Sequence, residues 1–553
     1  MTTTGRPAST SEESEDGYFR RHTNPPVFFT SIALALAFLV AGVFFTDATD
    51  RAASAVLDFI TTNLGWLYIL VATLFLAFVI AMMASRYGRL RLGPDDSRPE
   101  YRTLPWFAML FSAGMGIGLV FFGVYEAPYH LVNAPMVANG GPDGPADAMR
   151  YTIFHWGLHP WAIYIVLGLS MGYFCFRKGL PLRPAAGLYP LIGDRIYGWV
   201  GHVVDVLAVF GTLFGLATSL GLGAQQINAG LGEVFGLPNN PTLQLAIIAL
   251  ITAIAVVSVV LGIDKGIRRL SVLNLGLALL LMLFVFAVGP KLFILTGLAD
   301  YTGEYLQNVV GMSFETFSAE THPDAAAWQA SWTLFYWGWW MSWSPFVGMF
   351  IARISYGRTI RQFIAGSLFA PVVASIVWFA VLGGTGLFYQ RNGAVDIASA
   401  APEEALFTLL GALPLTGWLA TALALLTVIV VAVFFATSSD SGSLVVDMLT
   451  NGGDPHPVRA QRIFWAITEG AIAAVLLWVG GAVALGALQA ASVTAGLPFG
   501  IALVLLAIGL AKGFRSERLA SVPSASALVA SDASRQRGTA RKDHEPVRES
   551  VDT

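Results

Sequence analysis

The sequence predicts an all-α polytopic membrane protein with twelve transmembrane helices. Of its 553 residues, 55% are hydrophobic and 12% are charged, and the mean hydropathy is +0.65, which is too apolar for a series of soluble domains. Apolar runs of roughly 20 residues, the length that crosses a bilayer core of about 30 Å as a helix, recur through the middle of the chain. The connections between these runs alternate between basic and acidic, as the loops of a multi-pass protein do.

Each apolar run predicts one span, because the connections between runs are short. In chain order the predicted spans lie near residues 27–46, 66–85, 105–128, 149–175, 199–230, 241–262, 271–296, 328–353, 361–388, 414–438, 460–480 and 484–511. They define one membrane domain of residues 27–512. The flanking residues 1–26 and 513–553 are polar and lack apolar periodicity, which predicts two disordered cytoplasmic tails.

The charged residues predict the orientation of these spans. Cytoplasmic connections collect Lys and Arg, and the connection after every second span is basic, for example at Arg177 and Lys178 or at Arg358 and Arg361. The intervening loops carry mostly Asp and Glu. Both termini are therefore expected in the cytoplasm, with the chain crossing the cell inner (plasma) membrane many times.

Several functional classes are excluded at this stage. The net charge of −3 gives no indication of nucleic-acid binding, and the sequence has no GxxxxGK[ST] loop to hold the phosphates of ATP. The spans contain no titratable cluster with catalytic spacing, so we expect neither an enzyme nor a bound cofactor. A channel is disfavoured because bulky aromatic residues occupy the predicted spans.

Two spans contain residues that break helices. The third span reads FSAGMGIGLVFFG, with Gly114, Gly116 and Gly118, and the eighth reads WSPFVG, with Pro345. They are five spans apart and so cross the membrane in opposite directions. This predicts an inverted repeat of five helices, preceded by two extra helices, with repeat 1 at about 105–296 and repeat 2 at about 328–511. Proteins that move small solutes often bind them at mid-membrane where such helices break.

The glycines of the third span have two interpretations. Small residues at this spacing let helices pack closely in lipid. A GxG pair also lets the backbone unwind, because glycine lacks a Cβ, and unwound carbonyls that line a polar cavity suit a small cation.

An aromatic cluster lies near the centre of the membrane in the eighth span. Trp343 is ten residues before Arg353, which marks the inner end of the span, and this is a distance of about 15 Å or half the core. An interfacial belt of Trp does not lie at that depth. One face of the helix carries Tyr336, Trp339, Trp340 and Trp343, at the spacing i, i+3, i+4 and i+7. A packed core remains the alternative explanation.

The fourth span adds Trp156 and Tyr164, eight residues apart and so on one face. Aromatic faces that converge in a desolvated cavity suit a quaternary ammonium group, which has no N–H to donate and is held by cation–π attraction. His155 and His159 lie at i, i+4 in the same span. No carboxylate or thiol accompanies them, so we expect structural hydrogen bonds rather than a metal site.

These motifs resemble the betaine/choline/carnitine transporter family. The resemblance rests on the block FYWGWWMSWSPFVGMFIARISYGRTIRQF and on GMGIG, HWGLHPWAIY and FFATSSDS, and it extends over about residues 20–512. It implies the LeuT-like inverted-repeat fold in a transporter domain of twelve helices, usually assembled as a homotrimer in the lipid bilayer. It also implies transport of a small trimethylammonium compound, most closely as in the sodium-coupled glycine-betaine carriers.

The same resemblance implies the residues of the site. The substrate box would consist of Trp156, Tyr164, Trp339, Trp340 and Trp343, with Gly114, Gly116 and Gly118 giving room for a carboxylate. A sodium ion (Na+) would be held by the carbonyls of Ser112, Met115 and Phe434 and by the hydroxyls of Thr437 and Ser438. The intramembrane Thr-Ser-Ser-Asp that ends at Asp440 independently favours an ion path.

Three departures from the family pattern bear on function. Thr212 and Phe346 match a second sodium site, but Leu216 stands where a second threonine is expected, so the number of coupled ions is open. Choline-selective relatives tend to carry an acidic residue at the position of Gly118. The family also usually has Glu-Pro after the glycine helix, where this chain reads Glu126-Ala127-Pro128, which shifts a kink and leaves the role of Glu126 open.

The sequence therefore favours a sodium-coupled symporter that imports glycine betaine or a related compatible solute by alternating access. The alternative is proton-coupled or exchange uptake of choline or carnitine, against which Gly118 and the hydroxyl pair of Thr437 and Ser438 argue.

Overall fold

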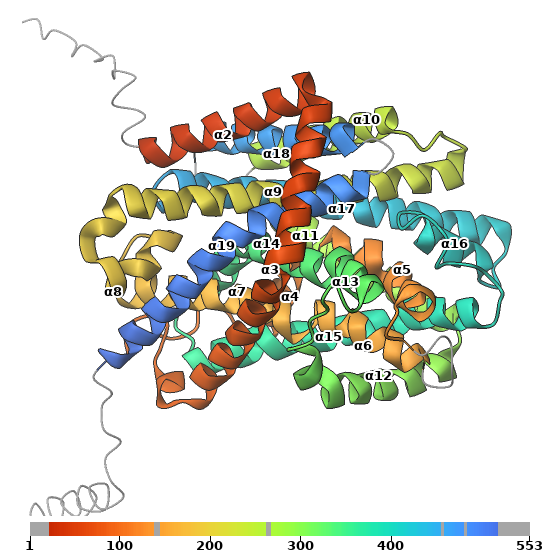
Figure 1. Cartoon of the computed structure of the whole chain (residues 1–553), viewed down its shortest axis with the longest axis horizontal. Coiled ribbons are helices and arrows are strands. Elements are labelled where there is room, and N and C mark those ends of the chain that lie inside the picture. Colours follow the sequence, from red (N-terminus) through yellow and green to blue (C-terminus); the bar gives the residue numbers. More distant parts are fainter. Residues whose placement is uncertain are drawn as a thin grey trace, which may run out of the picture. The chain divides into compact units, whose positions relative to one another are not determined.

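The regular elements of the protein are helical throughout its described residues (Figure 1), which confirms the predicted all-α fold. The computed structural model describes residues 22–114, 116–137, 144–261, 267–454, 458–480 and 484–517. Within them, extended pairing is limited to one isolated bridge between Arg91 and Thr359. The predicted tails lie almost entirely outside the described residues.

Long helices account for most of the described chain. They are α2 (Pro25–Phe44), α3 (Thr46–Ala84), α4 (Thr103–Gly114), α5 (Ile117–Asn133), α6 (Gly144–Trp156), α7 (Leu158–Met171), α9 (Trp199–Phe235), α10 (Pro241–Leu261), α11 (Ile267–Val288), α12 (Lys291–Met312), α14 (Phe335–Arg353), α15 (Ile360–Arg391), α17 (Gly417–Thr450), α18 (Arg459–Gly480) and α19 (Ala484–Arg515). The shorter elements are η1 (Arg86–Arg89), η2 (Gly172–Arg177), η3 (Pro184–Leu188), α8 (Tyr189–Ile192), η4 (Gly193–Tyr197), α13 (Pro323–Gln329), η5 (Ala330–Leu334) and α16 (Ala405–Ala412).

Many of these helices are able to span a membrane. By length and apolar composition alone, nine helices of the described residues qualify, and the bent pair α11 and α12 would add a tenth. The predicted third span corresponds to α4 with α5, and the predicted eighth span corresponds to α14. These three helices are not among the nine. The chain is therefore a multi-pass membrane protein, and the number twelve stays a prediction.

The predicted seventh span, 271–296, is wrong at its end. Helix α11 stops at Val288, and after Pro290 the chain turns by 114° into α12, a helix that the sequence analysis missed. The turn occurs where proline lacks the N–H needed to continue a helix. Helix α12 buries Ile294 and Tyr301 against its neighbours, among them α6 and α15, and exposes polar residues, so its sequence resembles a loop.

Two other helices are longer than predicted. Helix α3 begins at Thr46 instead of residue 66, and α17 continues to Thr450 instead of ending at 438. The polar residues that marked a loop in each case are accommodated by the helix. Asp440 in α17, for instance, is buried in an ion pair with Arg462 of α18.

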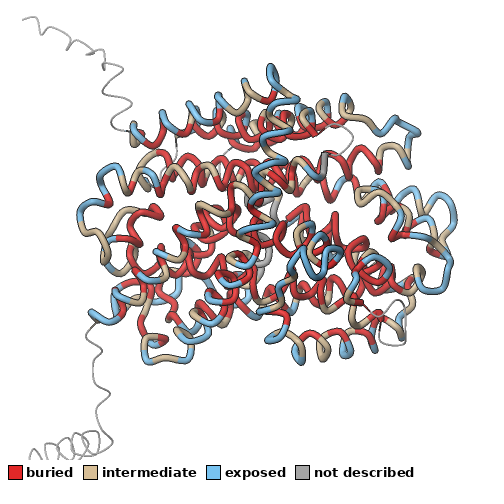
Figure 2. The backbone as a smooth tube through the Cα atoms, in the orientation of Figure 1, coloured by how far each residue is buried: buried red, intermediate tan, exposed pale blue. Residues whose placement is uncertain are grey.

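The packing of the helices has an internal two-fold pattern. Helix α5 packs on α15 and α14 packs on α7, while α10 packs on α17 and α18 packs on α9. If the two predicted repeats are exchanged, the contact of α5 with α15 becomes the contact of α14 with α7. In the same way, the contact of α10 with α17 becomes that of α18 with α9. The exchange also interchanges α9 and α17, which pack along each other. In Figure 2 the buried backbone lies mainly in the inner helices. The pattern supports the inverted repeat, whose boundaries remain a prediction.

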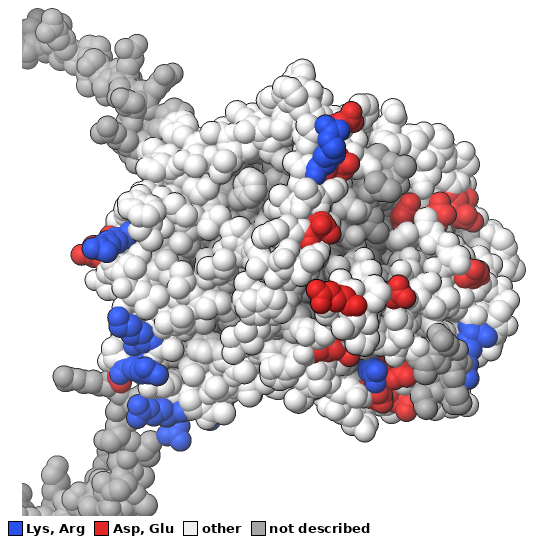
Figure 3. Space-filling model, viewed as in Figure 1, with Lys and Arg blue, Asp and Glu red and all other residues white. Residues whose placement is uncertain are grey.

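Charge is unevenly distributed over the face in Figure 3. Lys and Arg gather mainly at the left edge, near and below α8, with a few more at the upper centre and the lower right, whereas Asp and Glu predominate over the right half. This separation agrees with the alternation of basic and acidic connections along the sequence.

The expected helix breaks are only partly present. The third span is interrupted between α4 and α5, where Gly116 is extended with φ −117° and ψ −155°. The eighth span is not interrupted, because α14 continues through Pro345. Pro345 cannot donate to the carbonyl of Met341, and the hydroxyl of Ser344 donates to that carbonyl instead at 2.7 Å. A break at Gly157, between α6 and α7, was not expected.

This substitute hydrogen bond can be tested. Ser344→Ala leaves the carbonyl of Met341 without a donor and should reduce the free energy of unfolding by about 1 kcal/mol. Pro345→Ala restores the backbone N–H, so Ser344→Ala should cost much less in a Pro345→Ala background. Thermal unfolding of the purified variants in detergent measures both effects, and equal costs in the two backgrounds would contradict this explanation.

Candidate functional site

Five predicted box residues come together from two segments of the chain. Trp156 ends α6 and Tyr164 lies in α7, on either side of the break at Gly157. The other three, Trp339, Trp340 and Trp343, lie on one face of α14. All five side chains are buried, with exposed fractions of 1–3%.

The rings form a stack with two edge-on partners. Trp339 and Trp340 stack with centroids 4.7 Å apart and planes at 13°, and Trp343 continues this stack at 6.1 Å from Trp340. The ring of Trp156 meets Trp340 edge-on at 4.9 Å, and Tyr164 meets Trp340 and Trp343 edge-on at 6.3 Å. The structure thus brings together aromatic residues of both predicted repeats.

The polar atoms of these rings differ in their partners. The indole N–H groups of Trp156, Trp339 and Trp340 donate to Glu126 and to the carbonyls of Gly215 and His155, respectively. Within the described part of the chain, Tyr164 Oη and Trp343 Nε1 are buried without a partner. Buried donors are normally satisfied, so these two are available to an acceptor on a ligand, such as a carboxylate.

The glycines of the third span lie directly against the tryptophans. A Cβ on Gly118 would lie 2.5 Å from Trp339 Cη2 and 2.9 Å from Trp156 Cη2, and one on Gly116 would lie 3.2 Å from Trp343 Cη2. Gly118 therefore permits the observed ring positions. Gly114 is the last residue of α4, and Met115 lies outside the described residues.

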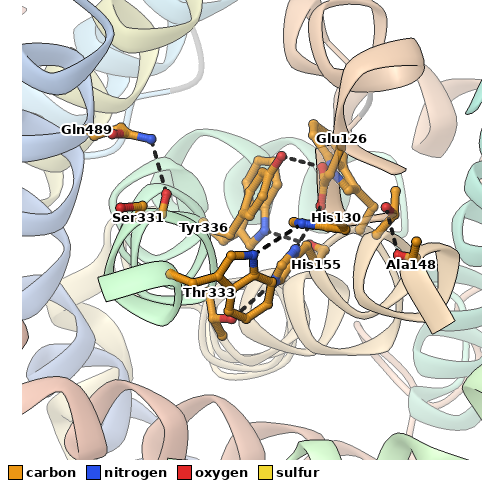
Figure 4. Close-up of polar contacts among 12 residues, drawn as sticks. Glu126, His130, Ala148, His155, Ser331, Thr333, Tyr336 and Gln489 are labelled. Carbon is orange, nitrogen blue, oxygen red and sulfur yellow. Dashed lines mark hydrogen bonds and ion pairs between the residues drawn. The ribbon is translucent and has the colours of Figure 1, made fainter. Parts of the chain in front are cut away.

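A buried carboxylate lies behind the aromatic rings. Glu126 is fully buried in α5, a helix that continues past Pro128 to Asn133. Its Oε2 accepts from Tyr336 Oη at 2.5 Å and from Trp156 Nε1 at 2.9 Å. Its Oε1 lies 2.7 Å from His155 Nδ1 and 3.3 Å from His130 Nε2. Figure 4 shows these side chains converging on Glu126.

The expectation that no carboxylate accompanies the two histidines is wrong. Glu126 contacts His155, and the ligand atoms of Glu126, His130 and His155 lie within 4.8 Å of one another. The sequence could not show this, because Glu126 comes from a different helix. The described contacts nevertheless give three of the four nitrogens hydrogen-bond partners, since His155 Nε2 also bonds Thr333 Oγ1 at 3.0 Å and His159 Nε2 bonds Ser313 Oγ at 3.0 Å. Among the described residues, His159 Nδ1 is buried without a partner.

The predicted sodium ligands of α17 belong to a helix that packs against α5, the helix that follows the break in the third span. Gly223 of α9 is adjacent to Ile117, the first residue of α5, and to Phe435, next to Phe434. Thr437 Oγ1 donates to its own helix at Val433 O, 2.7 Å away, which leaves oxygen lone pairs free for a cation. Ser438 is partly exposed, and Ser112 lies in α4, although its side chain is not described.

The predicted second sodium site lacks one hydroxyl. Thr212 and Phe346 are both buried, in α9 and α14. Leu216 is also buried, and its Cδ1 packs against Gly442 of α17. The next hydroxyl along α9 is that of Thr218, which bonds Ser492 of α19 at 2.8 Å.

Asp440 is not free to line an ion path. Its carboxylate pairs with Arg462 at 2.5 Å and accepts from Ser258 of α10. Sequence analysis noticed the acid and missed the arginine. The available signal was an Arg within a predicted span, since a charge in the membrane normally has a partner.

Glu126 and His130 were also missed as site residues. The available signal was a Glu and a His at i, i+4 in an otherwise apolar span, which is a functional candidate by default.

Comparisons with known proteins identify related sequences. Residues 26–519 match the sequence model of the family described as BCCT, betaine/carnitine/choline family transporter. The glycine betaine transporter OpuD of Bacillus subtilis is 43% identical over 493 residues, 89% of this chain and 94% of the relative. Glycine betaine transporter 1 of Vibrio parahaemolyticus is 42% identical over 501 residues, 89% and 94% of the two chains.

Two further matches are a transporter named for several substrates and a solved structure of much lower sequence identity. A glycine betaine/proline/choline transporter of Vibrio parahaemolyticus is 41% identical over 509 residues, 89% of this chain and 90% of the relative. Among solved structures, a Na+-coupled sialic acid symporter aligns with a TM-score of 0.44 and 15% identity, over 79% of this chain and 86% of that chain.

The close approach of Gly118 to the rings gives a test. Gly118→Ala should displace Trp339 and Trp156, because overpacking costs about 1–3 kcal/mol, and should weaken binding of glycine betaine about tenfold. Tryptophan fluorescence of the purified protein reports the binding. Gly276→Ala is the control, since a Cβ at Gly276 meets no atom within 4 Å. Unchanged affinity for Gly118→Ala would show that the ring positions do not matter for binding.

Proposed function

The chain belongs to the betaine/carnitine/choline transporter family, and on this premise we propose that it is a symporter for glycine betaine or a closely related trimethylammonium solute. Sodium is the coupling ion, and the protein works by alternating access between the two sides of the cell membrane. As in the family that it resembles, it assembles as a homotrimer with both termini in the cytoplasm.

The observation that carries this proposal is the buried aromatic cluster of Trp156, Tyr164, Trp339, Trp340 and Trp343. A trimethylammonium group has no N–H to donate and is attracted to aromatic faces by about 2 kcal/mol or more when desolvated. The partnerless Tyr164 Oη and Trp343 Nε1 give the carboxylate of a zwitterion two donors beside the rings. Transporters named for glycine betaine are 42–43% identical to this chain.

Gly118 favours a zwitterion over choline. A cation without its own carboxylate would gain from an acidic side chain near the site, and at Gly118 a side chain would collide with Trp339 and Trp156. Choline or carnitine uptake by proton coupling or exchange is the outcome that would replace this proposal.

Sodium coupling is supported by the hydroxyls of Thr437 and Ser438 in α17, a helix that packs against α5 after the interruption of the third span. Hydroxyl and carbonyl oxygens are hard ligands, which suit a desolvated Na+. If Leu216 leaves the second site without its hydroxyl, sodium is coupled only through the site at Thr437 and Ser438.

Uptake into proteoliposomes tests substrate and coupling together. Labelled glycine betaine is supplied with an inward sodium gradient, an inward proton gradient, or no gradient. We expect accumulation with the sodium gradient alone. Accumulation of choline or carnitine instead, without betaine uptake, would contradict the proposed substrate, and accumulation driven by protons would contradict the proposed ion.

The aromatic cluster gives a prediction for transport. Trp340→Leu removes an aromatic face while keeping an apolar side chain, and should raise the KM for glycine betaine roughly tenfold or more. Trp337→Leu is the matched control. Trp337 is equally buried in the same helix, but it stacks on His159, away from the box, at 5.3 Å. If the two variants have the same KM as the wild type, the cluster serves packing only.

The sodium site gives a second prediction. Replacing both Thr437 and Ser438 with Ala removes two oxygen ligands and should abolish stimulation of uptake by sodium. Thr427→Ala is a control, because Thr427 lies in the same helix and likewise bonds only a carbonyl of its own turn among the described contacts. Sodium stimulation that persists in the double variant would place the coupling ion elsewhere.

A further inference from the structure

We propose that Glu126 is a positioning residue that makes the aromatic box selective for positive charge. It does so through Trp156 and Tyr336, by fixing their rings and by supplying the negative charge that a cationic head group balances. The inference rests on the proposed function, because it concerns the recognition of a trimethylammonium group.

The hydrogen-bond pattern fixes the protonation of His130. Trp328 Nε1–H can only donate, and it donates to His130 Nδ1 at 3.3 Å. His130 Nδ1 is therefore an acceptor, which leaves the ring neutral with its proton on Nε2. That proton points at Glu126 Oε1, 3.3 Å away, so His130 serves as a neutral donor to the carboxylate.

The same reasoning extends to the other neighbours of Glu126. The N–H of Trp156 can only donate, and the hydroxyl of Tyr336 donates to the same oxygen. His155 bonds Oε1 through Nδ1 and has Thr333 as a partner at its other nitrogen, whose hydroxyl is able to donate to it. Trp156, Tyr336 and His130 thus donate to the two oxygens, and His155 Nδ1 is able to supply a fourth donor. This set is what an ionised carboxylate requires, since it only accepts hydrogen bonds.

The negative charge lacks a permanent cationic partner. Within the described residues, the ion-pair contacts of Glu126 are those with His130 and His155, and no Lys or Arg is among them. The carboxylate is fully buried. A buried charge without a counter-charge is costly, and a cation that is present only when the substrate is bound relieves this cost at that moment.

Glu126 also connects directly to the box. The ring of Trp156, which it holds through the indole N–H, meets Trp340 edge-on at 4.9 Å. The ring of Tyr336, which it holds through the hydroxyl, stacks on Trp340 at 5.6 Å with planes at 23°. An acceptor at an N–H or O–H polarises that group and its ring. The carboxylate therefore acts on the faces of two rings without touching the substrate.

This role differs from that of a simple scaffold. A scaffold would influence charged and uncharged ligands equally. A charge-selecting residue influences the charged ligand more, and this difference is measurable.

The experiment compares glycine betaine with tert-butylacetate, its isostere with carbon in place of the ammonium nitrogen. Isothermal titration calorimetry on the purified full-length protein gives the Kd of each ligand. We expect the wild type to bind glycine betaine at least tenfold more tightly than the isostere. In Glu126→Gln this ratio should fall by about fivefold or more, through a loss of betaine affinity, while the rings retain the remaining preference for the cation. Glu126→Asp, which keeps the charge, should recover part of the ratio.

Tyr336→Phe removes the hydroxyl through which Glu126 acts on one of the two rings, and keeps the charge, the ring and the bond to Trp156. We expect its ratio to lie between those of the wild type and Glu126→Gln. Equal losses for both ligands in Glu126→Gln would show that Glu126 only holds the structure, and would overturn the proposal. If Glu126→Gln does not fold, Glu126→Asp is compared with the wild type in its place, and a ratio unchanged in Glu126→Asp would overturn the proposal.

A failure of the proposed function is recognisable separately. If the wild type transports choline and not glycine betaine, the same comparison is made between choline and its carbon isostere, tert-butylethanol. The ratio in wild type and Glu126→Gln then supports or overturns the role of Glu126, whichever trimethylammonium solute is carried.

Discussion

The hydrocarbon core of a membrane offers no water to hydrogen-bond a peptide group, so every interruption of a helix must be satisfied from within the protein. The arrangement of this protein follows from where it meets that requirement. At Pro345 a neighbouring hydroxyl replaces the missing backbone donor and the helix continues. At Gly157 the helix is broken, and the freed N–H of Leu158 donates to Tyr305 of α12. The box residues Trp156 and Tyr164 flank this second interruption, so the aromatic site is built around a break.

Local sequence patterns predicted the parts of the site that lie on one helix. The spacing of Trp339, Trp340 and Trp343 was sufficient to place them on one face of a helix, and in α14 their rings lie against one another. Their position at mid-membrane stays a prediction. Most spans were likewise visible as apolar runs. What the sequence could not show depends on contacts between distant segments. The amphipathic helix α12 looks like a loop until its neighbours are known, and the bend before it is visible only as Pro290.

The same limit applies to the charged residues inside the membrane. Asp440 and Glu126 were each conspicuous in the sequence, yet their roles depend on partners from other helices. Asp440 is neutralised by Arg462, which makes it a structural residue that joins α17 to α18. The described donors to Glu126, from α5, α6 and α14, are neutral. Under the proposal made above, its charge is balanced by the cationic head group of the substrate. Leu216, which stands where the family pattern expects a second threonine, packs against Gly442 of α17.

The central claim is that the aromatic cluster holds a methylated ammonium group. A cryo-electron microscopy structure of the protein with glycine betaine and sodium tests it most directly. We predict density for the ammonium nitrogen within about 6 Å of the ring centroids of Trp156, Tyr164, Trp340 and Trp343, the range of a cation–π contact. Density for the solute at another place, with these rings still packed against one another, would contradict the account.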